Sequence, residues 1–282
     1  MHLDIDTRDV AAVTAEIKRL YQIMFPDGDA EFVPRAVGWT QACFTGRHPG
    51  YQAIDAQYHD FEHTLQGALC QARLLFGRHG DGAEPRLTQS WFELGLLAIL
   101  LHDTGYLKAL NDTQGTGGKF TFIHVERSTT FARRLLEAKG YSTPQTDAVQ
   151  RMIQCTGVQV ALPAVPFAGE EDRLLGYALG TADLLGQMAA PDYVAKLPVL
   201  YEEFAEAARY ESQDARATFQ FSSVQDLLRK TEGFWRHYVL PKLDHDFSGL
   251  YRFLNTPYPD GPNPYLDRVE ANLLALRQSR LS

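Results

Sequence analysis

The stretch ILLHDTG, residues 99–105, ends an apolar run with a histidine and an aspartate side by side. Residues 87–101 are apolar almost all round the helical period, which predicts a helix that is buried on every side. His102 and Asp103 therefore stand where a central helix should end, and Gly105 lets the chain turn away. Such a pair can cap a helix terminus, or it can form part of a chemical site.

Helical periodicity extends over most of the chain. Apolar residues recur every three or four positions, as the buried face of an amphipathic helix requires. Alternating β-branched runs are nearly absent, except at residues 157–162, which prolines interrupt. We therefore predict an all-α protein. The predicted helices cover residues 10–24, 58–78, 87–101, 124–139, 147–154, 173–188, 192–210, 223–240 and 265–280.

The composition limits the class of protein. A chain of 282 residues with 45% hydrophobic content is long enough to bury a large core. A net charge of -8 disfavours a general nucleic-acid or anionic-membrane surface. Three scattered cysteines predict reduced thiols, and the sequence shows neither a signal peptide nor a run long enough to span a bilayer. We therefore expect a cytoplasmic protein with a small-molecule partner, either monomeric or a homo-oligomer.

Four predicted helices carry histidines or isolated carboxylates. His59 and His63 of YHDFEH are spaced i, i+4, which places both on one face of the predicted helix. His124 begins another helix, and Asp183 lies among small and apolar residues, where a charge is costly to bury alone. Each residue by itself has an ordinary explanation, such as a helix cap or a surface pair. Imidazoles and carboxylates that converge from separate helices indicate a divalent metal site.

The order of these residues resembles that of the HD-domain superfamily of metal-dependent phosphohydrolases. The H…HD…D pattern of that superfamily matches His63, the pair His102–Asp103, and Asp183. YHDFEH also resembles the YHNxxH motif of its cyclic-nucleotide phosphodiesterase branch, so that the match extends over residues 58–204. The resemblance implies a helical bundle with the metal at its centre. The expected organisation is an N-terminal helical segment at residues 1–50, a catalytic domain at 51–245 and a C-terminal extension at 246–282.

The resemblance also implies the role of single residues. His59 would donate a proton to the leaving-group oxygen while a metal-bound hydroxide attacks the phosphorus. Asp103 would bridge to a second metal, for which His124 is the candidate extra ligand. The implied cofactors are one or two divalent ions, among which the sequence does not distinguish Mn, Mg, Fe, Zn and Ni. The ligands implied for the first metal are His63, His102, Asp103 and Asp183.

Two positions depart from the family pattern. Asp60 replaces the usual asparagine, and Tyr106 stands where the phosphodiesterases have another histidine, which removes a group that supports the second metal. Candidates for substrate binding have weaker support. They are Tyr58 in the motif, Lys108 as a phosphate ligand, and Gln220 with Phe221 as a counterpart of the glutamine and phenylalanine that clamp a purine.

These observations favour a metal-dependent phosphohydrolase, and the YHDFEH motif favours a nucleotide phosphodiester, cyclic or not, as the substrate. Three alternatives stay open: a phosphomonoesterase or nucleotidase of the same superfamily, a non-catalytic HD module that senses a ligand, and an HD-type oxygenase with a di-iron site. Two further motifs have simpler explanations. DHD at residues 244–246 is expected in a loop or cap, and residues 111–119, with GTGGK, fail the P-loop spacing and are expected to be a mobile loop.

Overall fold

The computed structural model describes residues 5–157, 160–210 and 221–278. These residues form an all-α protein, as predicted, with one isolated antiparallel bridge between Tyr51 and Ala109. The candidate strand at residues 157–162 is not formed where it is described, and Leu162–Ala164 is a 3-10 turn instead. Residues 158 and 159 of that segment lie outside the described residues.

Each predicted helix is present, and one further helix, α2, was not predicted. The helices are α1 (Val10–Met24), α2 (Phe32–Phe44), α3 (Phe61–Asp81), α4 (Gln89–Leu101), α5 (His124–Ala138), α6 (Thr143–Gln154), α7 (Glu170–Met188), α8 (Tyr193–Tyr210), α10 (Val224–Phe234) and α11 (Pro264–Gln278). The 3-10 turns are η1 (Thr104–Tyr106), η2 (Gly117–Phe120), η3 (Leu162–Ala164) and η6 (Leu250–Leu254). The π-helical turns are η4 (Trp235–Val239) and η5 (Lys242–Asp246).

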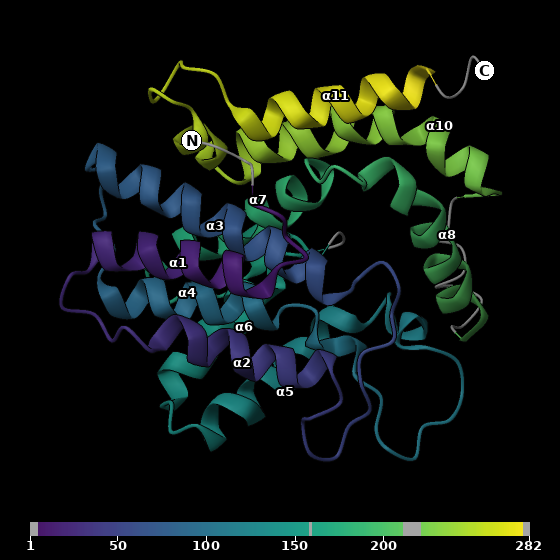
Figure 1. Ribbon diagram of the computed structural model, residues 1–282, viewed down its shortest axis with the longest axis horizontal. Coiled ribbons are helices and arrows are strands. Elements are labelled where there is room, and N and C mark those ends of the chain that lie inside the picture. Colours follow the sequence, from purple (N-terminus) through teal and green to yellow (C-terminus); the bar gives the residue numbers. More distant parts are fainter. Residues whose placement is uncertain (1–4, 158–159, 211–220, 279–282) are drawn as a thin grey trace.

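Helices α3, α4 and α7 form the centre of the bundle. Helix α3 packs against α1, α4 and α7, while α4 also contacts α2 and α6 (Figure 1). Every residue of α4 from Leu94 to Leu101 is buried, as its uniformly apolar sequence predicts. The side chain of Thr88 caps this helix by accepting a hydrogen bond from the backbone amide of Trp91. The burial of residues 94–101 thus places the C-terminal end of α4 in the middle of the molecule.

Helices α3 and α7 approach each other backbone to backbone. A Cβ added to Gly186 would lie 2.9 Å from the carbonyl group of Gln66 and from the amide of Gly67. Gly67 in turn packs against Ile99 and against the Cα of Asp183. Glycine at position 186 therefore permits a separation at which any side chain would collide with the backbone of α3.

The start of α3 corrects the predicted helix at residues 58–78. Asp60 is the N-cap, with extended backbone angles, and its carboxylate accepts a hydrogen bond from the amide of His63 at 2.8 Å. His59 therefore precedes the helix, and the prediction that His59 and His63 share one helix face is wrong. The two imidazoles therefore start from different backbone conformations, His59 from the segment before the cap and His63 from the first turn of α3.

The segment at residues 111–119 was predicted to be a mobile loop, but several contacts fix it. The ammonium group of Lys119 lies 2.6 Å from a carboxylate oxygen of Asp112, and Lys108 lies 2.7 Å from Asp55. Asp55 also accepts a hydrogen bond from the amide of Gly117 at 2.6 Å. Buried lysine–carboxylate pairs thus hold the loop against the body of the protein.

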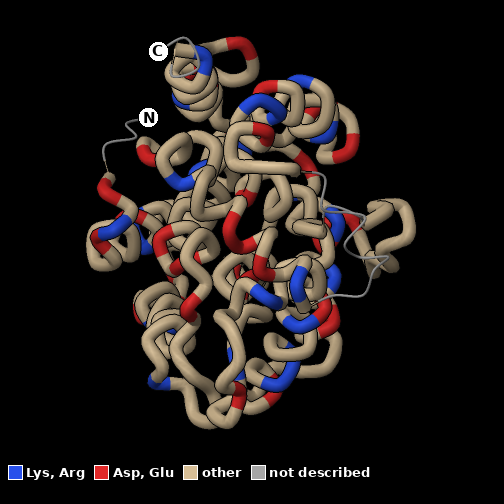
Figure 2. The backbone as a smooth tube through the Cα atoms, turned by 90° about the vertical axis from the view of Figure 1, so that its right-hand side faces the viewer, with Lys and Arg blue, Asp and Glu red and all other residues tan. Residues whose placement is uncertain are grey.

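The C-terminal part places α10 and α11 side by side along one end of the molecule (Figure 1). The DHD sequence lies in the π-helical turn η5 and not in a loop, and Asp244 binds the hydroxyl group of Tyr251. In Figure 2, Lys and Arg alternate with Asp and Glu along the described chain and form no continuous basic stripe. None of the helices in the described part of the chain is both long and apolar enough to cross a membrane.

We expect opposite effects from two glycine-to-alanine substitutions. Gly186→Ala places a methyl group against the backbone of α3 and should lower the free energy of unfolding by about 1–3 kcal/mol. Gly38→Ala lies on the exposed face of α2 with no atom within 4 Å of the new Cβ, and should raise it by about 0.5–1 kcal/mol. Urea denaturation measures both changes, and equal effects would contradict the proposed α3–α7 approach.

Candidate metal centre

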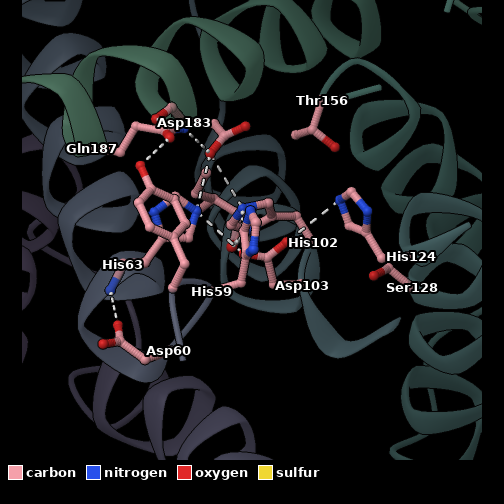
Figure 3. A network of polar contacts seen from close by, with 12 residues as sticks. His59, Asp60, His63, His102, Asp103, His124, Ser128, Thr156, Asp183 and Gln187 are labelled. Carbon is pink, nitrogen blue, oxygen red and sulfur yellow. Dashed lines mark hydrogen bonds and ion pairs between the residues drawn. The ribbon is translucent and has the colours of Figure 1, made fainter. Parts of the chain in front are cut away.

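Four side chains converge at the centre of the bundle. His63 lies in the first turn of α3, His102 is the C-cap of α4, Asp103 follows it directly, and Asp183 lies in α7. Figure 3 shows that these side chains point toward one another from three different helices. We call these four residues the His–Asp cluster. All of them are at least nine-tenths buried, so water does not solvate their charges.

Each imidazole of the cluster lies close to both carboxylates. The Nε2 atom of His63 is 3.2 Å from Asp103 Oδ2 and 3.3 Å from Asp183 Oδ1. The Nε2 atom of His102 is 3.2 Å and 3.5 Å from the same two oxygens. Ligand atoms around one ion with bonds of about 2.1 Å are roughly 3.0–3.5 Å apart, so these separations fit a single divalent cation.

Two of these atoms are buried in close ion pairs but form no hydrogen bond of good geometry. His102 Nε2 and Asp103 Oδ2 accept or donate no hydrogen bond among the described residues, although both are fully buried. Buried polar groups without partners are rare, and an ion that binds them is one of the few explanations. Two carboxylates and two neutral imidazoles leave a net charge of −2, which matches a divalent cation. His63, His102 and Asp103 alone already satisfy the spacing of a metal-binding group.

Backbone carbonyl groups orient two imidazoles. The Nδ1 atom of His102 lies 2.6 Å from the carbonyl oxygen of Ile99, and that of His124 lies 2.6 Å from the carbonyl oxygen of Thr121. In each ring the proton is held on Nδ1, which leaves the lone pair of Nε2 directed at the carboxylates. Metal-binding histidines are commonly positioned by such a bond.

A second chain of contacts orients Asp183. The side-chain amide of Gln187, one turn further along α7, donates to the backbone carbonyl of Asp183 at 3.1 Å and reaches its carboxylate at 3.4 Å. Tyr58 donates its hydroxyl to Gln187 at 2.8 Å. Tyr58 is buried, so that in this structure it supports the carboxylate, while its predicted contact with a substrate stays untested.

The charges of the cluster depend on one another. Burial alone would lower the pKa of His63 and His102, but Asp103 and Asp183 outweigh it and raise the pKa of both histidines. Burial alone would raise the pKa of Asp103 and Asp183, but the two histidines lower the pKa of both carboxylates. Each carboxylate is therefore stabilised here by protonated imidazoles, and a divalent cation would take the place of those protons.

His59 lies beside the cluster and is held by a residue that the sequence analysis missed. Its Nδ1 atom is 2.7 Å from Glu203 Oε1, and the backbone amide of Tyr58 donates to Glu203 Oε2 at 2.7 Å. Burial would raise the pKa of Glu203, but His59 and these hydrogen bonds lower it, so the carboxylate is ionised. The centre of the His59 ring is 5.4 Å from that of His63. Because Glu203 binds Nδ1 of His59, Nε2 is the ring nitrogen that is left to contact another molecule.

The position predicted to support a second metal is occupied by an aromatic ring. Tyr106 is fully buried and stacks on His59 and His124, with ring centres 4.7 Å and 4.9 Å apart. His124 Nε2 is 3.7 Å from Asp103 Oδ1, which is longer than any contact within the cluster. Burial lowers the pKa of His124, which favours the neutral form that binds metals. Figure 3 shows Ser128 and Thr156 on the same side of the cluster as His124.

Gly105 ties the HD pair to α5 for a different reason than the predicted one. Its backbone has no left-handed conformation, but a Cβ there would collide with the carbonyl oxygen of His124. Its amide donates to Ser128 at 2.8 Å, and its carbonyl oxygen accepts from Arg127. The missing side chain therefore allows close contact with α5 and so sets the distance between His124 and Asp103.

The remaining candidates for substrate binding have mixed outcomes. The ammonium group of Lys108 is already bound by Asp55 and by the carbonyl oxygen of Gly115, which does not favour a role as phosphate ligand. Phe221 stacks on Phe204, the neighbour of Glu203, with ring centres 6.0 Å apart. Gln220 lies outside the described residues.

Comparison with known proteins places the chain in a family. A family profile described as Npun_R2479-like matches residues 109–252, just over half of the chain, so the protein belongs to the Npun_R2479-like family. The matched region includes His124, Asp183 and Glu203, whereas the HD pair lies before it. No curated protein matches the sequence.

Two of the three His–Asp dipeptides of the chain provide a matched test of metal binding. His102→Ala should remove most of the bound divalent metal, whereas His245→Ala, in the exposed pair His245–Asp246, should leave it unchanged. Metal analysis after dialysis measures this difference. Addition of Mn²⁺ to chelator-treated protein should also stabilise the native fold by about 2.7 kcal/mol at a hundredfold excess over Kd, but not that of His102→Ala. Equal metal content in both variants would contradict the assignment.

Proposed function

We propose that this protein is a metal-dependent phosphohydrolase that cleaves a phosphodiester bond of a nucleotide. The observation that carries the proposal is the imidazole of His59, which a buried carboxylate holds next to a cluster suited to a divalent cation. A site that only bound a metal would not need an oriented imidazole outside the set of metal ligands. The resemblance to the HD-domain superfamily supports the same reaction.

Two groups of residues would have separate roles in hydrolysis, one in binding the cation and one in donating a proton. His63, His102, Asp103 and Asp183 would hold the cation, which when bound supplies Lewis acidity toward water and phosphoryl oxygens. Glu203 accepts a hydrogen bond from Nδ1–H of His59 and thereby directs Nε2 toward the substrate as the proton donor. That proton would pass to the leaving oxygen of the substrate, because a sugar alkoxide leaves poorly without protonation.

Three half-buried phenylalanines next to these residues support a nucleotide as the substrate. Phe122, two residues before His124, stacks on Phe204 with ring centres 6.5 Å apart, and Phe204 stacks on Phe221. Aromatic rings of this kind bind nucleobases by stacking, at about 1–3 kcal/mol per base.

Tyr106 favours a second candidate function, a phosphomonoesterase or nucleotidase that uses one metal. Its ring fills the place where a further histidine would support a second ion. A screen of metal-supplemented protein with bis(p-nitrophenyl) phosphate, p-nitrophenyl phosphate and cyclic nucleotides separates the two. Turnover of the monoester alone would contradict the phosphodiesterase. No turnover of any of these substrates, with no metal bound after supplementation, would favour the ligand-sensing module, and an iron-dependent absorbance would favour the di-iron oxygenase.

The role of His59 predicts a loss that depends on the leaving group. His59→Asn should lower kcat for cyclic nucleotides by about 10²–10⁴-fold, because a sugar alkoxide needs the proton. The same variant should retain most activity on bis(p-nitrophenyl) phosphate, whose leaving group is stable as an anion. Its metal content should equal that of the native protein, and loss of the metal would show that His59 is a ligand instead.

Glu203 should act as a positioning residue, which a conservative replacement can reveal. Glu203→Ala removes the acceptor of the hydrogen bond from His59 Nδ1, so the imidazole loses its orientation. We expect a lower kcat for cyclic nucleotides, partly restored in Glu203→Gln, whose side-chain oxygen can accept the same hydrogen bond, with unchanged metal content in both variants. Equal losses in Glu203→Ala and Glu203→Gln, for cyclic nucleotides and for bis(p-nitrophenyl) phosphate alike, would indicate a structural role only.

A further inference from the structure

A cavity of about 230 Å³ lies next to the His–Asp cluster, on a different face of α3. Its walls come from residues 5–8, from α3, from the end of α7 with the turn that follows, and from α11. We call it the N-terminal cavity. None of its lining residues belongs to the cluster or contacts His59.

One side of the N-terminal cavity is apolar and the other is cationic. Leu69, Ala189 and Ala190 are buried and form the apolar side. Arg73 is also buried, and it donates a hydrogen bond to the hydroxyl group of Tyr265 at 3.1 Å. A guanidinium inside the protein, beside an apolar surface, is suited to a carboxylate or phosphate that carries an apolar group.

The three carboxylates that line the cavity pair with cations other than Arg73 and Arg268. Asp6 pairs with Arg8 at 3.0 Å, while Glu62 and Asp192 lie 3.1 Å and 3.6 Å from the ammonium group of Lys196. Arg268 on α11 forms no ion pair within the described part of the chain. Its charge therefore adds to that of Arg73 in the field inside the cavity.

The N-terminal cavity contacts the same helix pair that spaces the metal ligands. Gly186 lines the cavity and packs against the backbone of Gln66, which also lines it. Gln66 follows His63 by three residues, and Gly186 follows Asp183 by three residues. A molecule in the cavity would therefore touch the α3–α7 contact less than one helical turn from His63 and from Asp183.

We propose that the N-terminal cavity is a second ligand site, which binds a small organic anion and is coupled to the His–Asp cluster through the α3–α7 contact. The ligand is an organic carboxylate or phosphate monoester with one apolar group. The volume is below the range of about 300–1,000 Å³ that drug-sized ligands occupy, so the ligand is smaller than a nucleotide. The coupling is reciprocal: the anion changes the affinity for the metal, and the metal changes the affinity for the anion by the same factor.

Calorimetric titration of the full-length protein tests the ligand class. Phenylacetate and phenyl phosphate are the anionic probes that distinguish carboxylate from phosphate, inorganic phosphate tests the need for an apolar group, and phenylacetamide is the neutral control. We expect at least one aromatic anion to bind at least tenfold more tightly than phenylacetamide and inorganic phosphate. Equal binding of the neutral probe, or no binding of either aromatic anion, would overturn the proposal.

Matched variants locate the site. Arg268→Gln should weaken binding of the anion about tenfold, whereas Arg229→Gln, an exposed arginine on α10, should not change it. Ala189→Leu should fill the cavity and abolish binding, and Arg268→Gln at the rim keeps the test valid if that variant does not fold. Unchanged binding in Arg268→Gln would overturn the site.

The coupling is measured by metal affinity and not by turnover, so it stands apart from the proposed reaction. Titration of Mn²⁺ with and without a saturating anion should give dissociation constants that differ by a factor of five or more. Identical constants would refute the coupling, while binding of the anion would still identify the ligand site.

Discussion

The structure depends on two buried imidazoles, each of whose Nε2 atoms lies within 3.5 Å of two buried carboxylates, between α3, α4 and α7. Two ionised carboxylates in a dry core are unfavourable unless positive charge lies between them. Protons on His63 and His102 can provide part of it, and a divalent cation can provide all of it while it binds the unpaired donor atoms. The cluster thus has a charge and a spacing with which it could hold a divalent cation.

The helical scaffold fixes this geometry before any ion binds. The contact of Gly186 with the backbone of α3 sets the separation of α3 and α7, and therefore that of His63 and Asp183. The packing of α4 on all sides holds His102 at the helix end, and the carbonyl group of Ile99 orients its ring. A preorganised site of this kind binds its ion without the cost of ordering flexible ligands.

Much of this arrangement follows from sequence patterns, and the rest depends on tertiary contacts. Apolar periodicity identified the central helices, and the resemblance of the H…HD…D order to that of the HD-domain superfamily implied the members of the cluster. Glu203 was missed because it lies on the buried stripe of α8 with Ala207, and the sequence does not show which partner faces that stripe. The apolar pattern predicted a helix that begins at residue 58 and includes His59. The N-cap at Asp60 instead starts α3 about one turn later, at Phe61. Gly105 was interpreted as a turn residue, whereas its role is contact with α5, a constraint between distant segments.

The central claim is that the His–Asp cluster binds a divalent cation, and anomalous X-ray scattering from crystals soaked in Mn²⁺ tests it most directly. We expect one anomalous peak about 2.0–2.3 Å from the Nε2 atoms of His63 and His102 and from carboxylate oxygens of Asp103 and Asp183. A weaker second peak between Asp103 and His124 would add a second ion to the same site. A peak elsewhere in the molecule, with ordered water or nothing between the four side chains, would contradict the account.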